Sequence, residues 1–241
     1  MTAVTILDCP CVPFADEEAV KERLRTIVTA GEGGYSVAIN AEKIQRYDHD
    51  EALRRVIDDA ALPVADGAGA VIGLRLLHGV RSAKIDLPRV LLEAAQDAGW
   101  RLFVGGASKA SNAGAMEEIM RRYPAMRIVG HADGYVPEAD LIAAVAAARP
   151  QVMLLAMGSP RQELMAKRII DAVPRVFIVG CGGALDILAG KLKRAPRFMV
   201  ENNLEWLYRL AKEPSRWRRQ LVLPRYMMRV FGEVAASRSR R

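Results

Sequence analysis

The sequence predicts an α/β fold, a Rossmann-like parallel sheet with helices on both faces, followed by a basic helical C-terminal appendage. Between about Ser36 and Asp186, short apolar runs alternate with helical patterns, as in βαβ units. After Leu188 the apolar runs stop and the chain becomes helical, aromatic and basic. We therefore expect an α/β core at residues 1–190 and a basic, aromatic appendage at 191–241.

Six apolar runs are the expected strands: Ser36–Ile39, Pro63–Ala65, Arg101–Val104, Arg127–Val129, Val152–Met157 and Val176–Val179. Between them, Pro88 opens a helix that stops near Gly99, and Pro137 opens an Ala-rich helix that stops before Pro150. Right-handed crossovers would join such strands into a doubly wound sheet.

Three further elements follow from local patterns. Val4–Leu7 is expected to form a short strand or hairpin, and a helix should run from Asp16 to Thr29. Ser159 has the spacing of an N-cap in a capping box with Gln162, with Pro160 in the first turn.

Composition restricts the class of protein. At 241 residues and 51% hydrophobic content, the chain can bury one sizeable core. No run approaches the ~20 apolar residues that span a bilayer, and no secretory signal is visible. The three cysteines are too few for a disulfide framework, which fits a reducing cytoplasm.

The net charge of +7 is located in the tail. Residues 205–241 hold ten Lys and Arg against three acids, so the remainder of the chain is neutral. A basic segment with interleaved tryptophans suits an anionic bilayer surface, although a solvated helical face has the same pattern. Nucleic acid is the rival polyanion, but no recognised DNA- or RNA-binding motif is present, and we expect no nucleic-acid partner.

Ligands of open parallel sheets bind beyond the carboxyl ends of the strands. Each expected strand is followed there by glycine or a small polar residue, which lets backbone amides approach a ligand. Glycine also ends strands in any α/β protein, but its recurrence along one edge favours a nucleotide or a phosphorylated ligand. The glycines expected to bind this ligand are Gly67, Gly105, Gly106, Gly134, Gly158 and Gly182.

The identity of that ligand is less constrained by the sequence. A full G-x-G-x-x-G motif and a Walker A motif are both absent, which disfavours NAD and a P-loop. Gly180–Gly183 is similar to the glycine loop of S-adenosylmethionine methyltransferases, but it follows the last strand rather than the first. Asp66 follows a strand and precedes Gly67, where a carboxylate can act as a general base or simply form an Asp-Gly turn.

No metal cofactor is expected. The three histidines, at 49, 78 and 131, lack ligand spacing. Asp48-His49-Asp50 matches an Asp-x-Asp metal motif, but it lies in a charged helical stretch from Glu42 to Asp59, where a solvated face or a helix junction is the better interpretation.

Several segments, in order from about Ser36 to Met228, carry a family resemblance: Val37–Lys43, Ala65–Gly67, Asp133–Tyr135, Ala156–Glu163, Gly180–Gly183, Lys193–Pro196, Leu204–Leu210 and Glu213–Arg216. Together they resemble the WecG/TagA/CpsF family of bacterial glycosyltransferases, glycosyltransferase family 26. The chain is most similar to the branch that transfers N-acetylmannosaminuronic acid.

The resemblance implies an inverting, metal-independent transferase that moves a sugar from a UDP-sugar to a polyprenyl-diphosphate-linked acceptor in cell-surface polysaccharide synthesis. The sugar would be N-acetylmannosaminuronic acid, N-acetylmannosamine or glucose. By the same resemblance, Asp66 is the catalytic base and Asn40 lines the active site. The implied donor-pocket residues outside the glycine loops are Arg81, Tyr135, Gln162 and Asp186.

The chain departs from the family pattern at two positions. Ala38 stands where many members carry Thr, and Lys84 replaces a Gly in the segment from Arg81 to Leu87. An added cation at position 84 would suit a phosphate or an acidic sugar, so the departures leave the donor sugar open.

The resemblance also implies that the appendage at 191–241 closes the active site and associates with the membrane, with tail arginines over a diphosphate. Guanidinium groups suit this role because they pair bidentately with phosphate oxygens. These candidates are Arg194, Arg209, Arg216 and Arg219. The protein would then be cytoplasmic and peripheral on the inner face of the membrane. A methyltransferase and a non-catalytic basic module that binds membrane or nucleic acid are the alternatives. The sequence leaves open a homo-oligomer, in which a neighbouring subunit covers the site.

Overall fold

The computed structural model describes residues 3–193, 196, 199, 207, 208, 210 and 222–239. The four arginines expected to bind phosphate, Arg194, Arg209, Arg216 and Arg219, lie outside the described residues.

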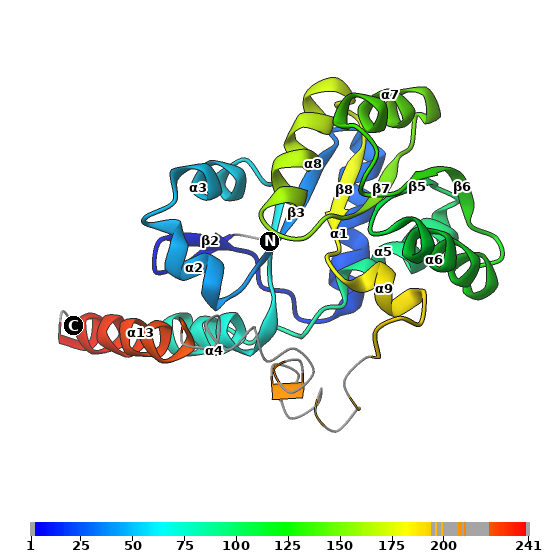
Figure 1. Ribbon diagram of the computed structural model, residues 1–241. Coiled ribbons are helices and arrows are strands. Elements are labelled where there is room, and N and C mark those ends of the chain that lie inside the picture. The colour runs from blue at the N-terminus through cyan, green and yellow to red at the C-terminus, as the bar shows by residue number, and fades with distance from the viewer. Residues whose placement is uncertain are drawn as a thin grey trace.

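A six-stranded parallel sheet with strand order β4-β3-β8-β7-β5-β6 forms the centre of the molecule (Figure 1), which confirms the predicted fold class. Its strands are β3 (Gly34–Ile39), β4 (Leu62–Ala65), β5 (Arg101–Gly106), β6 (Arg127–Ala132), β7 (Val152–Ala156) and β8 (Phe177–Gly180). All six expected strands are present. β5 and β6 continue two and three residues beyond their predicted ends at Val104 and Val129, so Gly105, Gly106 and Gly130 lie within strands.

The strands alternate their side chains between two apolar layers. In β7, Met153 and Leu155 face one layer, whereas Val152 and Leu154 face the other. The first layer is covered by α2 (Ala41–Tyr47), α3 (Glu51–Asp58), α4 (Gly67–His78), α7 (Glu138–Ala148), α8 (Arg161–Ala172) and α13 (Val222–Ser239). The second is covered by α1 (Glu17–Ala30), α5 (Leu87–Ala98), α6 (Lys109–Arg122) and α9 (Ala184–Leu188).

The N-terminal hairpin covers the edge of the sheet. β1 (Val4–Ile6) pairs antiparallel with β2 (Cys9–Cys11), and the amide of Val12 donates to the carbonyl of Pro63 in the edge strand β4 at 2.7 Å. Covering an edge strand in this way removes a site for unwanted strand pairing. Both the hairpin and the following helix confirm the sequence prediction.

The predicted start of α8 is wrong in one respect. Pro160, not Ser159, occupies the N-cap position, and no side chain caps the helix. The capping box fails because the Gln162 side chain is used elsewhere: its Oε1 accepts a hydrogen bond from the amide of Gly182 at 3.1 Å.

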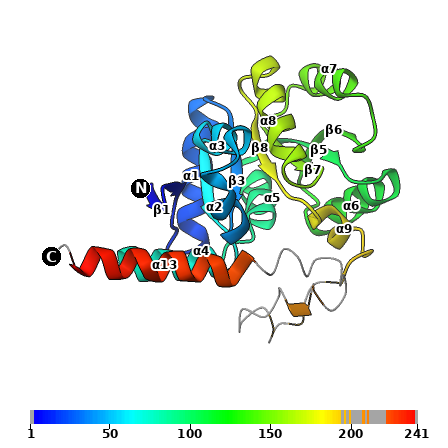
Figure 2. The ribbon, with the colours of Figure 1, turned by 60° about the vertical axis from the view of Figure 1, so that its left-hand side comes forward.

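The C-terminal helix α13 packs on the α/β core. It lies alongside α4 in both ribbon views (Figures 1 and 2), and Tyr226 and Val230 are fully buried in the first apolar layer. Among the described residues, no helix is long and apolar enough to cross a bilayer.

Candidate active site

Asn40 and Asp66 stand at the carboxyl ends of neighbouring strands. β3 and β4 pair in parallel with Ile39 opposite Ala65, so each candidate residue is the next one along its strand. The amide of Asp66 donates to the carbonyl of Ile39 at 2.8 Å. The backbone thus holds the predicted base directly beside the residue that precedes Asn40.

Both residues also begin a helix, but they use their side chains differently. Asn40 caps α2, and its Oδ1 accepts a hydrogen bond from the amide of Lys43 at 3.0 Å. Asp66 occupies the N-cap of α4 without forming a side-chain capping bond, and it is exposed. The amide oxygen of Asn40 is therefore committed to the helix, whereas the carboxylate of Asp66 is not committed to a cap and is accessible from solvent.

The helices that follow β3 and β8 diverge to opposite faces of the sheet, and we call the point between these two strand ends the opening. These strands are neighbours, yet α2, which follows β3, packs on one apolar layer, and α9, which follows β8, packs on the other. A ligand site in an open α/β sheet forms where successive connections diverge in this way. Asn40, Asp66 and the loop after β8 lie around this opening.

Gln162 lies beneath that loop. Only 6% of the residue is exposed, and besides the bond to Gly182 it packs so closely under Gly180 that a Cβ there would approach its Nε2 to 2.7 Å. Gln162 therefore shapes the loop that follows β8, and glycine at position 180 is required by this contact.

A buried ion pair lies beneath the opening, and the sequence analysis did not identify it. Lys43 Nζ donates to Glu163 Oε1 at 2.8 Å and to the carbonyl of Ala38 at 2.9 Å. Their side chains are only 7% and 2% exposed, and Glu163 Oε2 makes no hydrogen bond. Both residues stand in the family-like segments, Lys43 three residues after Asn40 and Glu163 directly after Gln162. Their positions next to the predicted site residues were the one feature of the sequence that could have indicated a role for them.

The candidate glycines fall into two groups. Gly67, Gly158 and Gly182 have φ values of +75°, +74° and +48°, and a Cβ at any of them would meet no atom of the described residues within 4 Å. This left-handed backbone favours glycine, and the space around it is open. These three glycines follow β4, β7 and β8, close to the opening.

The second group is packed. A Cβ on Gly106 would lie 2.2 Å from the carbonyl oxygen of Ala156, one on Gly105 2.5 Å from Met153 Cε, and one on Gly134 3.1 Å from the oxygen of Ala107. All three glycines are buried. Their lack of a side chain serves strand and loop packing on the β5–β6 side of the sheet.

The remaining predicted donor residues lie at three separate places. Tyr135, in the loop after β6, is 82% exposed, and the amide of Tyr135 is held by Asp133 Oδ1 at 2.9 Å. Asp186 lies in α9, and its carbonyl oxygen accepts hydrogen bonds from the amides of Lys191 and Leu192. Arg81 and Lys84 are both exposed, in the segment between α4 and α5.

Asp48 and Asp50 lie at the junction of α2 and α3. Asp50 caps α3 through Leu53, and this backbone hydrogen bond, with a second bond from Arg46, lowers the pKa of the Asp50 carboxyl. Asp48 Oδ2 accepts a hydrogen bond from Arg229 at 2.6 Å. No group of three or more His, Cys, Asp or Glu side chains suited to a metal occurs in the described part of the chain.

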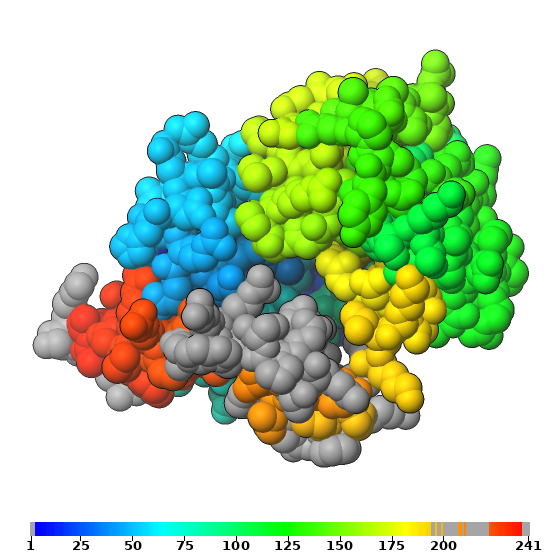
Figure 3. Space-filling view, viewed as in Figure 1, coloured from blue at the N-terminus to red at the C-terminus, as the bar shows by residue number. Residues whose placement is uncertain are grey.

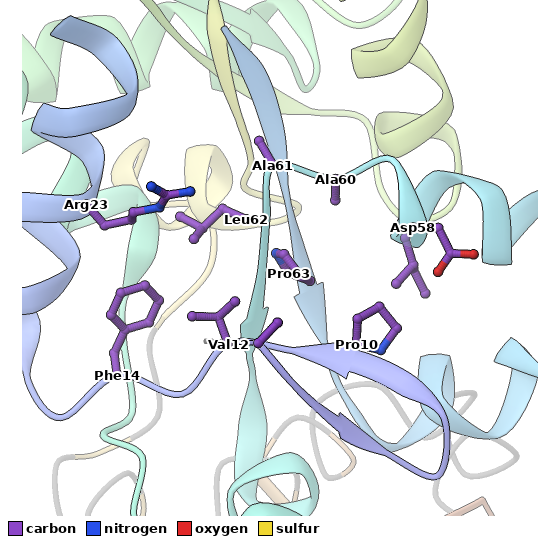
Figure 4. A pocket seen from close by; sticks show the side chains of 11 residues that line it. Pro10, Val12, Phe14, Arg23, Asp58, Ala60, Ala61, Leu62 and Pro63 are labelled. Carbon is purple, nitrogen blue, oxygen red and sulfur yellow. The ribbon is translucent and has the colours of Figure 1, made fainter. Parts of the chain in front are cut away.

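A pocket of about 260 Å³ lies away from this opening (Figure 4). It is formed between the hairpin, α1 and the amino end of β4, and its lining includes Pro10, Phe14, Arg23, Asp58 and Leu62. The lining includes none of the predicted site residues that the structure describes. We therefore place the candidate active site at the opposite, carboxyl end of the strands.

Comparison with known proteins identifies the family of the chain. The model of the family described as "Glycosyl transferase WecG/TagA/CpsF family" matches residues 4–240. A Bacillus spizizenii protein named N-acetylglucosaminyldiphosphoundecaprenol N-acetyl-beta-D-mannosaminyltransferase is 33% identical over 231 residues, covering 93% of this chain and 90% of that protein. A Bacillus subtilis protein of the same name is 35% identical over 182 residues, covering 74% of this chain and 71% of its own length.

The match spans the α/β core and continues through α13, and the related proteins are named as sugar transferases. This chain therefore belongs to the WecG/TagA/CpsF family of glycosyltransferases.

Proposed function

We propose that the protein transfers N-acetylmannosamine from its UDP derivative to a polyprenyl-diphosphate-linked N-acetylglucosamine on the inner face of the cytoplasmic membrane. The observation that carries the catalytic part is Asp66. It is exposed at the end of β4, and its own amide holds it beside the end of β3. An exposed carboxylate at the carboxyl end of a strand is in a position to act as a general base.

The reaction is a single displacement. Asp66 takes the proton of the acceptor hydroxyl while the hydroxyl oxygen forms a bond to the anomeric carbon. The bond from that carbon to the diphosphate breaks, and its electron pair leaves with UDP. Attack from the face opposite UDP inverts the anomeric configuration. Amides of the open loop at Gly158, together with arginines of the tail, would stabilise the departing diphosphate in place of a metal.

The donor sugar is proposed from the relatives. Both Bacillus proteins are named as N-acetylmannosaminyltransferases acting on N-acetylglucosaminyldiphosphoundecaprenol. The sequence resemblance to the N-acetylmannosaminuronic acid branch and the extra cation at Lys84 make the acidic sugar the second donor to test.

The membrane contact is proposed for α4 and α13. Each helix exposes large apolar side chains, Ile72 and Leu76 on α4 and Met228 and Phe231 on α13, at 38–67% exposure. Exposed Arg75 and Arg225 stand on the same helices. Apolar side chains flanked by arginines suit the interface of an anionic bilayer, where each cation contributes about 1 kcal/mol.

The test measures UDP release from UDP-N-acetylmannosamine, UDP-N-acetylmannosaminuronic acid and UDP-glucose with a short polyprenyl-diphosphate-N-acetylglucosamine acceptor. We expect acceptor-dependent release from the first donor, and a fall in kcat of about 10²- to 10⁴-fold in Asp66→Asn, the usual loss of a general base. Release should persist in EDTA.

Asp97→Asn is the matched control, because Asp97 is an exposed carboxylate near the end of α5. It should retain wild-type kcat. Asp66→Asn with wild-type kcat would refute the assignment of the base, and loss of activity in EDTA with recovery in Mn²⁺ would refute the metal-free mechanism.

A further inference from the structure

The C-terminal helix α13 lies against both helices that begin at the candidate catalytic residues. It packs on α4, whose N-cap is Asp66, and on α2, whose N-cap is Asn40. In Figure 3 the red atoms of α13 lie directly beneath the blue atoms of α2. One element near the end of the chain therefore touches both halves of the candidate site.

Tyr226 forms the central contact with α4. The residue is fully buried, and its hydroxyl donates to the carbonyl of Gly69 at 2.9 Å. A Cβ at Gly73, one turn further along α4, would lie 2.2 Å from the Tyr226 hydroxyl oxygen. The two glycines thus form a groove in α4 that is fitted to the tyrosine ring.

The same groove brings α4 against the first turn of α2. A Cβ on Gly69 would lie 3.0 Å from Cβ of Ala41, the residue after Asn40, and 3.5 Å from Cε1 of Tyr226. Gly69 is three residues after Asp66. The first turns of the two helices therefore meet at Gly69 and Ala41, with the Tyr226 ring packed against that junction.

Arg229 forms the contact with α2. It stands three residues after Tyr226 on α13, close to the same helical face. Its guanidinium donates to Asp48 Oδ2 at 2.6 Å and to Gln45 Oε1 at 3.2 Å. Tyr226 thus fixes α13 to α4, and Arg229 fixes it to α2.

We propose that Tyr226 and Arg229 are positioning residues, through which α13 clamps α2 and α4 and holds Asn40 and Asp66 in their reactive arrangement. The catalytic consequence rests on the function proposed above, because it assumes that Asp66 is the base. Since a displacement near 1 Å of a reacting group costs on the order of 100-fold in rate, a small rotation of α4 is sufficient for a large effect.

The main test uses the fit between Gly73 and Tyr226. Gly73→Ala places a methyl group against the tyrosine hydroxyl, and Tyr226→Phe removes that hydroxyl, leaving Ile6 Cγ2 at 3.1 Å as the nearest atom. We expect Gly73→Ala to lower kcat about tenfold or more with little change in the donor KM, measured well below its Tm. The double variant Gly73→Ala/Tyr226→Phe should recover most of the activity.

Amide hydrogen exchange provides a second readout that needs no substrate. In Gly73→Ala, exchange should accelerate about tenfold in α2 and in the first two turns of α4, while the amides of β5 and β6 keep wild-type rates. Arg229→Gln should have a smaller effect, confined to α2. Gly232→Ala is the control on α13, because a Cβ there meets no atom within 4 Å in the part of the chain that the structure describes. It should change neither kcat nor exchange.

The outcomes separate the clamp from the proposed function. Wild-type kcat and wild-type exchange in Gly73→Ala would overturn the clamp. So would a kcat that falls only in proportion to the unfolded fraction, because that result indicates a structural role alone. If the wild-type protein transferred no sugar from any donor, the proposed function would fail, and exchange in α2 and α4 would still decide whether α13 clamps them.

Discussion

The two sides of the sheet's carboxyl edge are built differently. On the β4-β3-β8-β7 side, the loops contain glycines with open space around them, and the polar side chains of Asn40 and Asp66 follow directly after strands. On the β5–β6 side, the glycines are packed against backbone or side chains, and Asn112 of α6 donates to the carbonyls of Val104, Gly106 and Ala132. One side is left accessible, and the other is closed by its own atoms.

The buried polar groups beneath the two sides also differ: one side has a charged pair and the other a neutral amide. Lys43 and Glu163 form a charged pair that connects α2 to α8 under the open side. The closed side relies on a neutral amide, Asn112, whose Oδ1 also meets His131 Nδ1 at 2.9 Å. The accessible side is thus supported from below by a charged pair, and this leaves its upper surface available for the ligand proposed above.

The largest expected effect comes from breaking the charged pair. Glu163→Leu leaves the Lys43 ammonium buried with the carbonyl of Ala38 as its acceptor, and we expect it to lower the free energy of unfolding by about 3–5 kcal/mol. Lys43→Met should cost a similar amount, because it leaves the buried carboxylate of Glu163 without its charged partner. Urea denaturation of both variants measures this.

The double variant Lys43→Met/Glu163→Leu sharpens the comparison. Replacing both charges by apolar groups of similar volume should restore the free energy of unfolding to within about 1 kcal/mol of wild type. A double variant as unstable as either single variant would show that the two residues do not act as a pair. The contrast between a charged pair under one side of the sheet and a neutral amide under the other would then have no energetic meaning.

The sequence predicted the fold well because the fold depends on local periodicity. Alternating strands such as β7 and the proline and glycine positions around α5 and α7 are short-range patterns. The capping box at Ser159 failed because Gln162 is used by Gly182, twenty residues further along the chain. No local pattern reports that contact.

The sequence indicated two candidate residues of the site, but not the contacts that support them. Asp66 and Asn40 follow from strand ends and motif resemblance, and the structure places them side by side. Lys43 and Glu163 are 120 residues apart, and the Tyr226 hydroxyl meets Gly69 across 157 residues. Contacts at such separations arise from tertiary packing, which single-sequence patterns do not encode. The expected tail arginines lie outside the described residues and remain a prediction.

The second prediction compares one glycine from each side. Gly106 has φ +97°, and a Cβ there would lie 2.2 Å from a backbone oxygen, so Gly106→Ala should cost at least about 3 kcal/mol in unfolding free energy. Gly182, with φ +48° and open surroundings, should lose only about 1 kcal/mol on substitution by Ala.

The effect on donor binding should be larger for Gly182→Ala than for Gly106→Ala, the reverse of the effect on stability. Because a methyl group at Gly182 would stand in the open loop after β8, we expect Gly182→Ala to raise the donor KM several-fold while the protein remains folded. Urea denaturation and donor titration of the two variants measure both quantities. An unaltered KM in Gly182→Ala would place the donor away from this loop and remove the functional half of the comparison.

The smallest expected effect concerns Cys181, which belongs to the same loop but faces a different environment from Gly182. Its amide donates to the carbonyl of Leu155 in β7 at 2.9 Å, and desolvation raises the pKa of its thiol to about 12. Burial likewise raises the pKa of the Cys9 and Cys11 thiols to about 12. At pH 8 these raised pKa values leave roughly a thousandfold less thiolate than in an ordinary cysteine, because the thiolate forms only as the pH approaches the pKa.

Iodoacetamide at pH 8 should therefore alkylate the folded protein slowly at all three cysteines and react readily once urea unfolds it. Cys181→Ser should keep the wild-type donor KM, in contrast to Gly182→Ala. Rapid alkylation of Cys181 that is blocked by UDP would instead place a reactive thiol in the donor site. The loop after β8 would then be accessible along its whole length rather than at its glycines alone.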